Sequence, residues 1–106
     1  MIDLYDIRRK SISFADGVDT PSWAVTQTIK LEVQPIRVSK GQRDDLVAIE
    51  IGGEQYIPNF YAWAPDNCEA TATDHITSNS GTILYLVLRT YDYEDHKEMD
   101  LRQVAP

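Results

Sequence analysis

The sequence is poor in cysteine and in long apolar segments, and each shortage excludes a class of protein. A single cysteine, Cys68, cannot form an internal disulfide. No apolar segment is long enough for a membrane-spanning helix, and the N-terminus is too polar for the core of a secretory signal. We therefore expect the chain to fold in a reducing cytoplasm, without membrane attachment.

Basic residues are also scarce, which bears on nucleic-acid binding. The chain carries 10 Lys and Arg against 17 Asp and Glu, a formal net charge of −7. Affinity for DNA or RNA depends largely on neutralised phosphates, so we do not expect a protein that wraps nucleic acid. An acidic surface instead suits a path along which DNA slides without sticking.

Motifs for catalysis or metal binding are missing. His75 and His96 stand far apart in the sequence and match no zinc spacing, and Asp74-His75 is an isolated pair. Cys68 and Ser80 lack the sequence context of an activated nucleophile, and no glycine-rich phosphate loop is present. We expect a protein that is not an enzyme and has no cofactor.

The sequence is rich in two-residue periodicity. Apolar side chains occupy both alternating faces from Ile83 to Leu88, after the turn-forming residues Ser78–Gly81. This predicts a strand buried on both faces, although a buried helix of the same length is left open by periodicity. Residues 23–33 alternate strictly, with Trp23, Val25, Gln27, Ile29, Leu31 and Val33 on one side. That pattern predicts a half-buried antiparallel strand.

Other segments complete an all-β pattern. Strands are predicted at Ser11–Phe14, in a hairpin over Val47–Ile57 that turns at Gly52-Gly53, at Phe60–Ala64 and at Glu98–Val104. Residues 15–22 are predicted to form a loop. Any strand within residues 69–77 is predicted to lie at the periphery of the fold, because this segment has few apolar residues. Residues 2–7 are predicted to form either a helical turn or an extended arm. We expect one domain, residues 1–106, forming a small antiparallel β-barrel or sandwich of about seven strands with a long loop or hairpin projecting at about 35–57.

Aromatic residues gather in one region, at Tyr56, Phe60, Tyr61 and Trp63. Such residues can stack single-stranded bases. Acidic side chains outnumber basic ones around them, so we interpret them as core and rim.

Two clusters of like charge are candidate interaction sites. Arg37, Lys40 and Arg43 form a basic segment, and Asp92, Glu94, Asp95, Glu98 and Asp100 form an acidic one. Complementary patches suit neighbours that associate head to tail and close into a ring. Two unrelated solvated faces are the alternative, because exposed charge pairs are individually weak.

The order of these elements resembles the small head-closure (stopper, or head–tail joining) proteins in the neck of long-tailed bacteriophages. In the first half, the resemblance rests on Met1–Tyr5, Ser11–Phe14, Trp23 and Val33-Gln34-Pro35. In the second half, it rests on Phe60–Ala64, Asp74–Ile76, Gly81 with Tyr85–Val87, Tyr91–His96 and Glu98–Val104. At one position the chain departs from the pattern, because Thr73 stands where the family usually has glycine.

The resemblance implies a virion protein of the phage neck, assembled in the bacterial host cytoplasm as a ring of six copies. Its implied partners are a portal-side adaptor and a tail terminator or tail tube protein, with DNA passing through the channel unbound. The long loop would close or line that channel, and its candidate residues here are Arg37, Lys40, Arg43, Asp44, Asp45, Glu50, Gly52, Gly53 and Glu54. The acidic cluster Asp92, Glu94, Asp95, Glu98 and Asp100 would face another subunit or partner.

Two alternatives stay open. Within the same machinery, the chain would be a tail terminator or another neck ring protein. In a different class, it would be a soluble β-barrel that binds a peptide or small ligand, using Trp23, Tyr56 and Trp63 as a pocket.

Overall fold

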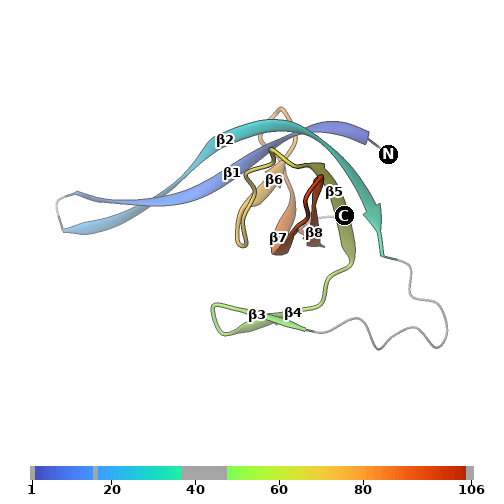
Figure 1. Cartoon of the computed structure of the whole chain (residues 1–106). Helices are drawn as coiled ribbons and strands as arrows, with labels where there is room; N and C mark the ends of the chain where they lie inside the picture. The colour runs from blue at the N-terminus through green and yellow to red at the C-terminus, as the bar shows by residue number, and fades with distance from the viewer. Residues whose placement is uncertain (1, 16, 37–47, 105–106) are drawn as a thin grey trace.

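All the regular structure of the protein is β-strand in the computed structural model, which describes residues 2–15, 17–36 and 48–104 (Figure 1). The strands are β1 (Ile2–Ala15), β2 (Val18–Pro35), β3 (Ile49–Ile51), β4 (Glu54–Tyr56), β5 (Phe60–Pro65), β6 (His75–Thr77), β7 (Ile83–Asp92) and β8 (His96–Gln103). Six form a closed antiparallel barrel in the order β1-β2-β5-β8-β7-β6, and β3 pairs with β4. The all-β prediction is confirmed, and of the two predicted architectures, barrel and sandwich, the protein forms the barrel. Within the described ranges, no helix has the length and apolarity needed to cross a membrane.

The interior of the barrel is filled with apolar side chains. Ile7, Leu31, Ile76, Met99 and Leu101 are each at most 1% exposed. They come from β1, β2, β6 and β8 and meet because the inward-facing residues of every strand point to one axis. The alternation predicted for the last strand is confirmed at Met99 and Leu101, which are both buried.

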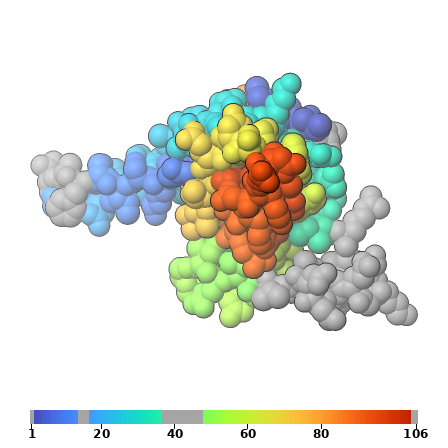
Figure 2. All heavy atoms as spheres, viewed as in Figure 1, coloured from blue at the N-terminus to red at the C-terminus, as the bar shows by residue number. Residues whose placement is uncertain are grey.

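Strands β1 and β2 continue beyond the barrel as a two-stranded ribbon (Figures 1 and 2). They pair from Ile2–Glu32 to Ala15–Val18, whereas β6 pairs with β1 only over Asp6–Arg8 and β5 with β2 only over Glu32–Pro35. The molecule consequently measures 54 Å along one axis against 30 and 29 Å along the others. We call the projecting part, residues 8–25, the arm.

The arm corrects the prediction of a loop at residues 15–22. Residues 18–22 continue strand β2, and Pro21 pairs with Ile12. Their polar composition resembles a loop, but the pairing with β1 and a turn at Gly17, with φ of +76°, settle the strand conformation. Proline is tolerated because the ribbon has open edges. The N-terminal residues 2–7, for which two conformations were open, are strand.

A β-bulge separates the barrel part of β2 from the arm. Ile7 pairs with Gln27 and Arg8 with Val25, which leaves Thr26 as the extra residue. An inserted residue moves the following side chains to the opposite face. Val25 and Trp23 are accordingly 45% and 36% exposed, whereas Ile29, Leu31 and Val33 are buried. The predicted single face over residues 23–33 is therefore wrong beyond the bulge.

Two further strand predictions need correction. Strand β7 is not buried on both faces: Ile83 is 38% exposed, and only Val87 and Leu88 are buried. The outer face of a small barrel meets solvent, which the apolar alternation did not reveal. Strand β6 is not peripheral, since it closes the barrel between β1 and β7 and both Ile76 and Thr77 are fully buried.

Candidate functional site

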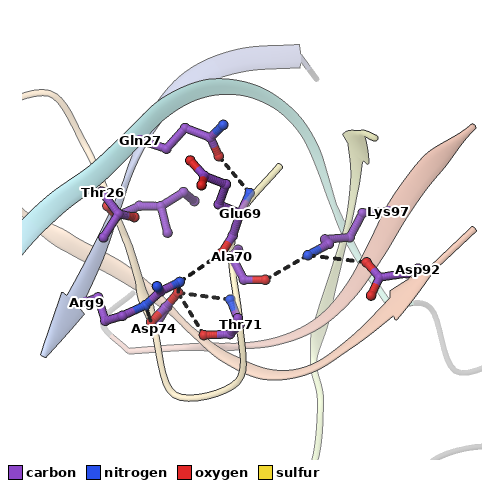
Figure 3. A network of polar contacts seen from close by, with 10 residues as sticks. Arg9, Thr26, Gln27, Glu69, Ala70, Thr71, Asp74, Asp92 and Lys97 are labelled. Atoms are coloured by element: carbon purple, nitrogen blue, oxygen red, sulfur yellow. Dashed lines mark hydrogen bonds and ion pairs between the residues drawn. The ribbon is translucent and has the colours of Figure 1, made fainter. Parts of the chain in front are cut away.

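The base of the arm is attached to the end of the barrel by a buried carboxylate (Figure 3). Arg9 donates from Nε and Nη2 to the two oxygens of Asp74, at 3.1 and 3.0 Å, and from Nη2 to the Glu69 carbonyl at 2.8 Å. Asp74 is 2% exposed and also accepts the Thr71 N–H at 2.9 Å. These contacts join β1 to residues 66–74, which we call the capping loop.

Strand β2 contacts the same loop at Gln27, just outside the arm. The Gln27 amide donates to the Asn67 carbonyl at 2.9 Å. It also accepts the Glu69 N–H at 2.8 Å, the contact drawn in Figure 3. Strand β1 at Arg9 and strand β2 at Gln27 are therefore both fixed to the capping loop, close to the point where the ribbon leaves the barrel. This double attachment sets the direction in which the arm projects.

The outer face of the arm is mostly apolar. Three cross-strand pairs form it: Arg8 with Val25, Lys10 with Trp23, and Ile12 with Pro21. Ile12 is 60% exposed, so this face is open to solvent away from the barrel. Near the barrel, Trp23 stacks on His75 with ring centroids 3.7 Å apart and an interplanar angle of 9°. Burial lowers the pKa of His75, because desolvation disfavours the charged imidazole.

The predicted acidic interface lies at the turn between β7 and β8 and along β8, and most of its charges are paired within the chain. Asp92 lies 3.3 Å from Lys97 Nζ, and Asp100 accepts hydrogen bonds from Arg89 and Tyr91. Glu94 makes none of these contacts and is exposed at the turn. Among the five predicted residues, Glu94 is thus the best placed to meet a partner.

Lys97 connects this turn to the capping loop. Lys97 is 8% exposed, and its ammonium donates to the Ala70 carbonyl at 2.9 Å (Figure 3). Buried ammonium groups require such partners. The acidic turn and the base of the arm therefore lie at the same end of the barrel.

An aromatic cluster accompanies the acidic turn. The His96 ring stacks between Trp63, at 5.4 Å, and Tyr93, at 4.7 Å. Its two nitrogens lie 2.7 Å from Asp95 and 2.7 Å from Glu98, and hydrogen bonds with Glu98 and Asp95 raise the pKa of His96. Trp63 and Tyr93 are 40% and 51% exposed. We call Trp63, Tyr93 and His96, with their rim of Glu94, Asp95 and Glu98, the aromatic patch.

The aromatic patch joins residues that are not neighbours in the sequence. Trp63 is far from His96 in the chain, and the two meet because β5 pairs with β8 through Trp63–Glu98 and Pro65–His96. The sequence does show the Tyr93-x-x-His96 spacing across a turn, which brings these two rings close together. It does not show that the strand carrying Trp63 pairs with the strand carrying His96. The aromatic residues between 56 and 63 were predicted to divide between core and rim, and Phe60 packs against the core whereas Trp63 is exposed.

The predicted Gly-Gly hairpin is confirmed at the other end of the barrel (Figure 1). Gly52 and Gly53 have φ of +59° and +86°, the left-handed conformation that such a turn needs at both positions. Glu50 and Glu54 are exposed on its strands, and Glu54 accepts the Tyr56 hydroxyl at 2.8 Å. The remaining predicted channel residues lie outside the described residues: Arg37, Lys40, Arg43, Asp44 and Asp45.

The three aromatic residues of the alternative ligand pocket do not converge. Tyr56 and His75 line an open hollow of about 450 Å³, together with Leu86, Arg102, Gln103 and Val104. Trp23 reaches this hollow only by stacking on His75, which is on β6. Trp63 instead stacks on His96 of β8, and β7 separates β8 from β6 in the barrel. In the described part of the chain, no group of three or more His, Cys, Asp or Glu side chains is arranged to hold a metal ion.

Comparison with known proteins gives no assignment for this chain. No protein-family description, no curated protein and no solved structure matches it.

Proposed function

We propose that the chain is a non-enzymatic structural protein of the neck of a long-tailed bacteriophage virion. In this proposal its copies form a ring between the portal-side adaptor and the tail terminator or tube, and the ring closes or lines the DNA channel. The observation that carries the proposal is the architecture: a barrel with a filled core extends an arm at one end and a short hairpin at the other. Projections from a rigid body suit assembly between copies and neighbours.

The backbone at Thr73 gives the resemblance independent support. Thr73 has φ of +73°, a left-handed conformation that β-branched residues rarely adopt. The family pattern has glycine at this place, and glycine is the residue that adopts positive φ without strain. Thr73 therefore has the backbone conformation that glycine favours, at the position where the family pattern has glycine.

The charge of the hairpin is consistent with contact with passing DNA. Glu50 and Glu54 are exposed on it, and the chain carries a net charge of −7. Carboxylates facing the channel would repel phosphates, so that DNA passes without binding.

Electron microscopy of portal-bearing capsids mixed with the purified chain tests the assignment. We expect added ring-shaped density below the portal, and a second ring when a tail component is supplied. Capsids that show no added density at saturating protein would contradict the neck assignment. Density that forms only on isolated tails would instead assign the chain to the tail terminator.

A hairpin replacement tests the gating role separately. In a variant with residues 49–56 replaced by a Gly-Ser linker, we expect necks to assemble and packaged DNA to leak. The hairpin is outside the barrel, so the barrel should fold without it. Particles that keep their genomes and infect normally would remove the gating role and leave the ring role intact.

The hollow beside Tyr56 and His75 favours one alternative of another class, a module that binds a small ligand or peptide. A ligand there would contact His75 and Arg102 and would change the chemical shifts of their side chains. Saturable shifts at these residues, together with no density on capsids, would favour the binding module.

A further inference from the structure

We infer that the outer face of the arm docks on the aromatic patch of a second copy of this chain, in a head-to-tail contact. The inference rests on the proposed function in one respect, since repetition of this contact would build the proposed ring. It goes further by naming the two surfaces that meet and the residues that bring them together.

The arm is an incomplete structure as it stands. Beyond the barrel it is a two-stranded ribbon, and a two-stranded ribbon alone is marginally stable in water. Its outer face presents Ile12, Pro21 and Val25 to solvent, with Ile12 at 60% and Val25 at 45% exposure. Burial of this face against a partner would therefore stabilise both the contact and the arm itself.

The aromatic patch offers the complementary surface. Trp63 and Tyr93 are exposed, and their stacking on His96 holds them in place before any partner arrives. Aromatic groups that are fixed in advance lose little conformational entropy on binding. Such residues are also the commonest anchors of protein interfaces.

Charge distinguishes the two surfaces and favours a head-to-tail arrangement. Arg9 is paired with Asp74, and most carboxylates of residues 92–100 are paired within the chain. This leaves Arg8 and Lys10 on the outer face of the arm and Glu94 at the aromatic patch. On the outer face of the arm, Lys10 lies opposite Trp23, and Glu94 lies exposed beside Tyr93. Opposite charges attract across an interface, while arm-to-arm or patch-to-patch contacts would bring like charges together.

The position of the two surfaces also fits a ring. The capping loop contacts the base of the arm through Asp74 and the acidic turn through Ala70, so both surfaces lie at one end of the barrel (Figure 3). Rotation about a ring axis keeps every copy at the same height. An arm that projects sideways at that height reaches the patch of the next copy, whereas it points away from its own barrel (Figure 2).

Cross-linking between two variants, each with one added cysteine, tests this contact. One chain carries Asp19→Cys, two residues from Pro21 on the same strand face, and the other carries a mass tag and Glu94→Cys. Native Cys68 is 4% exposed, so a short bis-maleimide should react with the introduced thiols. We expect the mixed pair to form several-fold more than either pair of identical chains, at high protein concentration and on portal-bearing capsids.

A neighbouring position provides the control. Thr20→Cys places the thiol one residue away, on the opposite face of the strand, and should give several-fold less of the mixed pair. A yield from Asp19→Cys no higher than that from Thr20→Cys, or pairs of identical chains only, would overturn the inference. Density on capsids without the mixed pair would refute the arm contact alone. The mixed pair without density would keep the arm contact and refute the neck assignment.

A charge exchange gives a second readout. Without added cysteines, Lys10→Glu and Glu94→Lys should each reduce self-association at high protein concentration several-fold, as measured by sedimentation velocity, and the double variant should restore it. Both residues are exposed, so the variants should fold. Equal losses in the single variants and no recovery in the double variant would refute the pairing of these two surfaces.

Discussion

Arg9 on the arm and Asp74 at the end of the capping loop are joined by two hydrogen bonds, at 3.1 and 3.0 Å, between groups 65 residues apart in the chain. The carboxylate is buried and the guanidinium is 44% exposed. A planar guanidinium that binds both oxygens of a carboxylate fixes orientation as well as distance. The Arg9–Asp74 ion pair explains how the two-stranded ribbon keeps a defined direction although most of its length projects beyond the barrel.

Removal of this carboxylate should destabilise the protein. Asp74→Ala leaves Arg9 and the Thr71 N–H without their acceptor, so we expect a loss of about 1–3 kcal/mol in the free energy of unfolding. Denaturant unfolding measures it. Asp66→Ala, in the same loop but at an exposed position, should change stability by less than about 0.5 kcal/mol. Equal effects of the two variants would contradict a specific role for Asp74.

Replacement of Thr73 by glycine should stabilise the protein. The left-handed conformation costs a non-glycine residue about 1–2 kcal/mol, and glycine adds about 0.5–1 kcal/mol of chain entropy to lose. The expected net gain for Thr73→Gly is about 0.5–1 kcal/mol, visible as a higher denaturation midpoint. Thr73→Val keeps the strained conformation and a β-branched side chain, so it should give no gain. A destabilised glycine variant would show that the hydroxyl or methyl of Thr73 matters more than the backbone.

The two histidines should titrate on opposite sides of the ordinary histidine pKa of 6.5. Hydrogen bonds with Glu98 and Asp95 raise the pKa of His96, while burial lowers the pKa of His75. NMR titration of the two imidazoles measures the order directly. Coincident titration of the two rings would contradict the stacked and hydrogen-bonded arrangement of His96.

The same shifts predict the pH dependence of stability. The contribution of His96 is complete below pH 6.5 and is lost as the pH rises through its raised folded-state pKa, because the native state holds the proton more tightly. The contribution of His75 has the opposite sign: it is complete above pH 6.5 and is lost as the pH falls through its lowered folded-state pKa. His96→Gln should therefore abolish the loss of stability on the alkaline side of pH 6.5 and leave the acidic side unchanged.

Two aliphatic residues of the β1–β2 hairpin should differ sharply in their effect on folding. Ile12 on the arm is 60% exposed, and Leu31 in the barrel is 1% exposed. Ile12→Ser should change the unfolding free energy by about 0.5 kcal/mol or less, whereas Leu31→Ala should cost about 2–5 kcal/mol. Thermal and denaturant unfolding compare the two. A large loss in Ile12→Ser would mean that the outer face of the arm is already covered in the isolated chain.

Periodicity determined the class of this protein and the positions of several strands. Alternation of apolar residues located β8 and the barrel part of β2, and aromatic content located β5. The Gly-Gly pair located the hairpin, because a two-residue turn of that kind needs positive φ at both positions. These features depend on residues that are close in the chain. The acidic cluster between residues 92 and 100 was also recognisable in the sequence. The sequence did not show that Lys97, Arg89 and His96 pair with most of its carboxylates.

The arm, its exposed face and the aromatic patch were decided only by the tertiary structure. Each depends on register between strands: one extra residue at Thr26 moves Trp23 and Val25 from the core side to the outside, and the pairing of β5 with β8 brings Trp63 to His96. A polar ribbon and a loop have similar composition, so only the pairing of Ser11–Ser13 with Thr20–Ser22 distinguishes them. The sequence determined which residues prefer strands, while cross-strand hydrogen bonds, which local preference does not encode, determined the face on which each side chain lies.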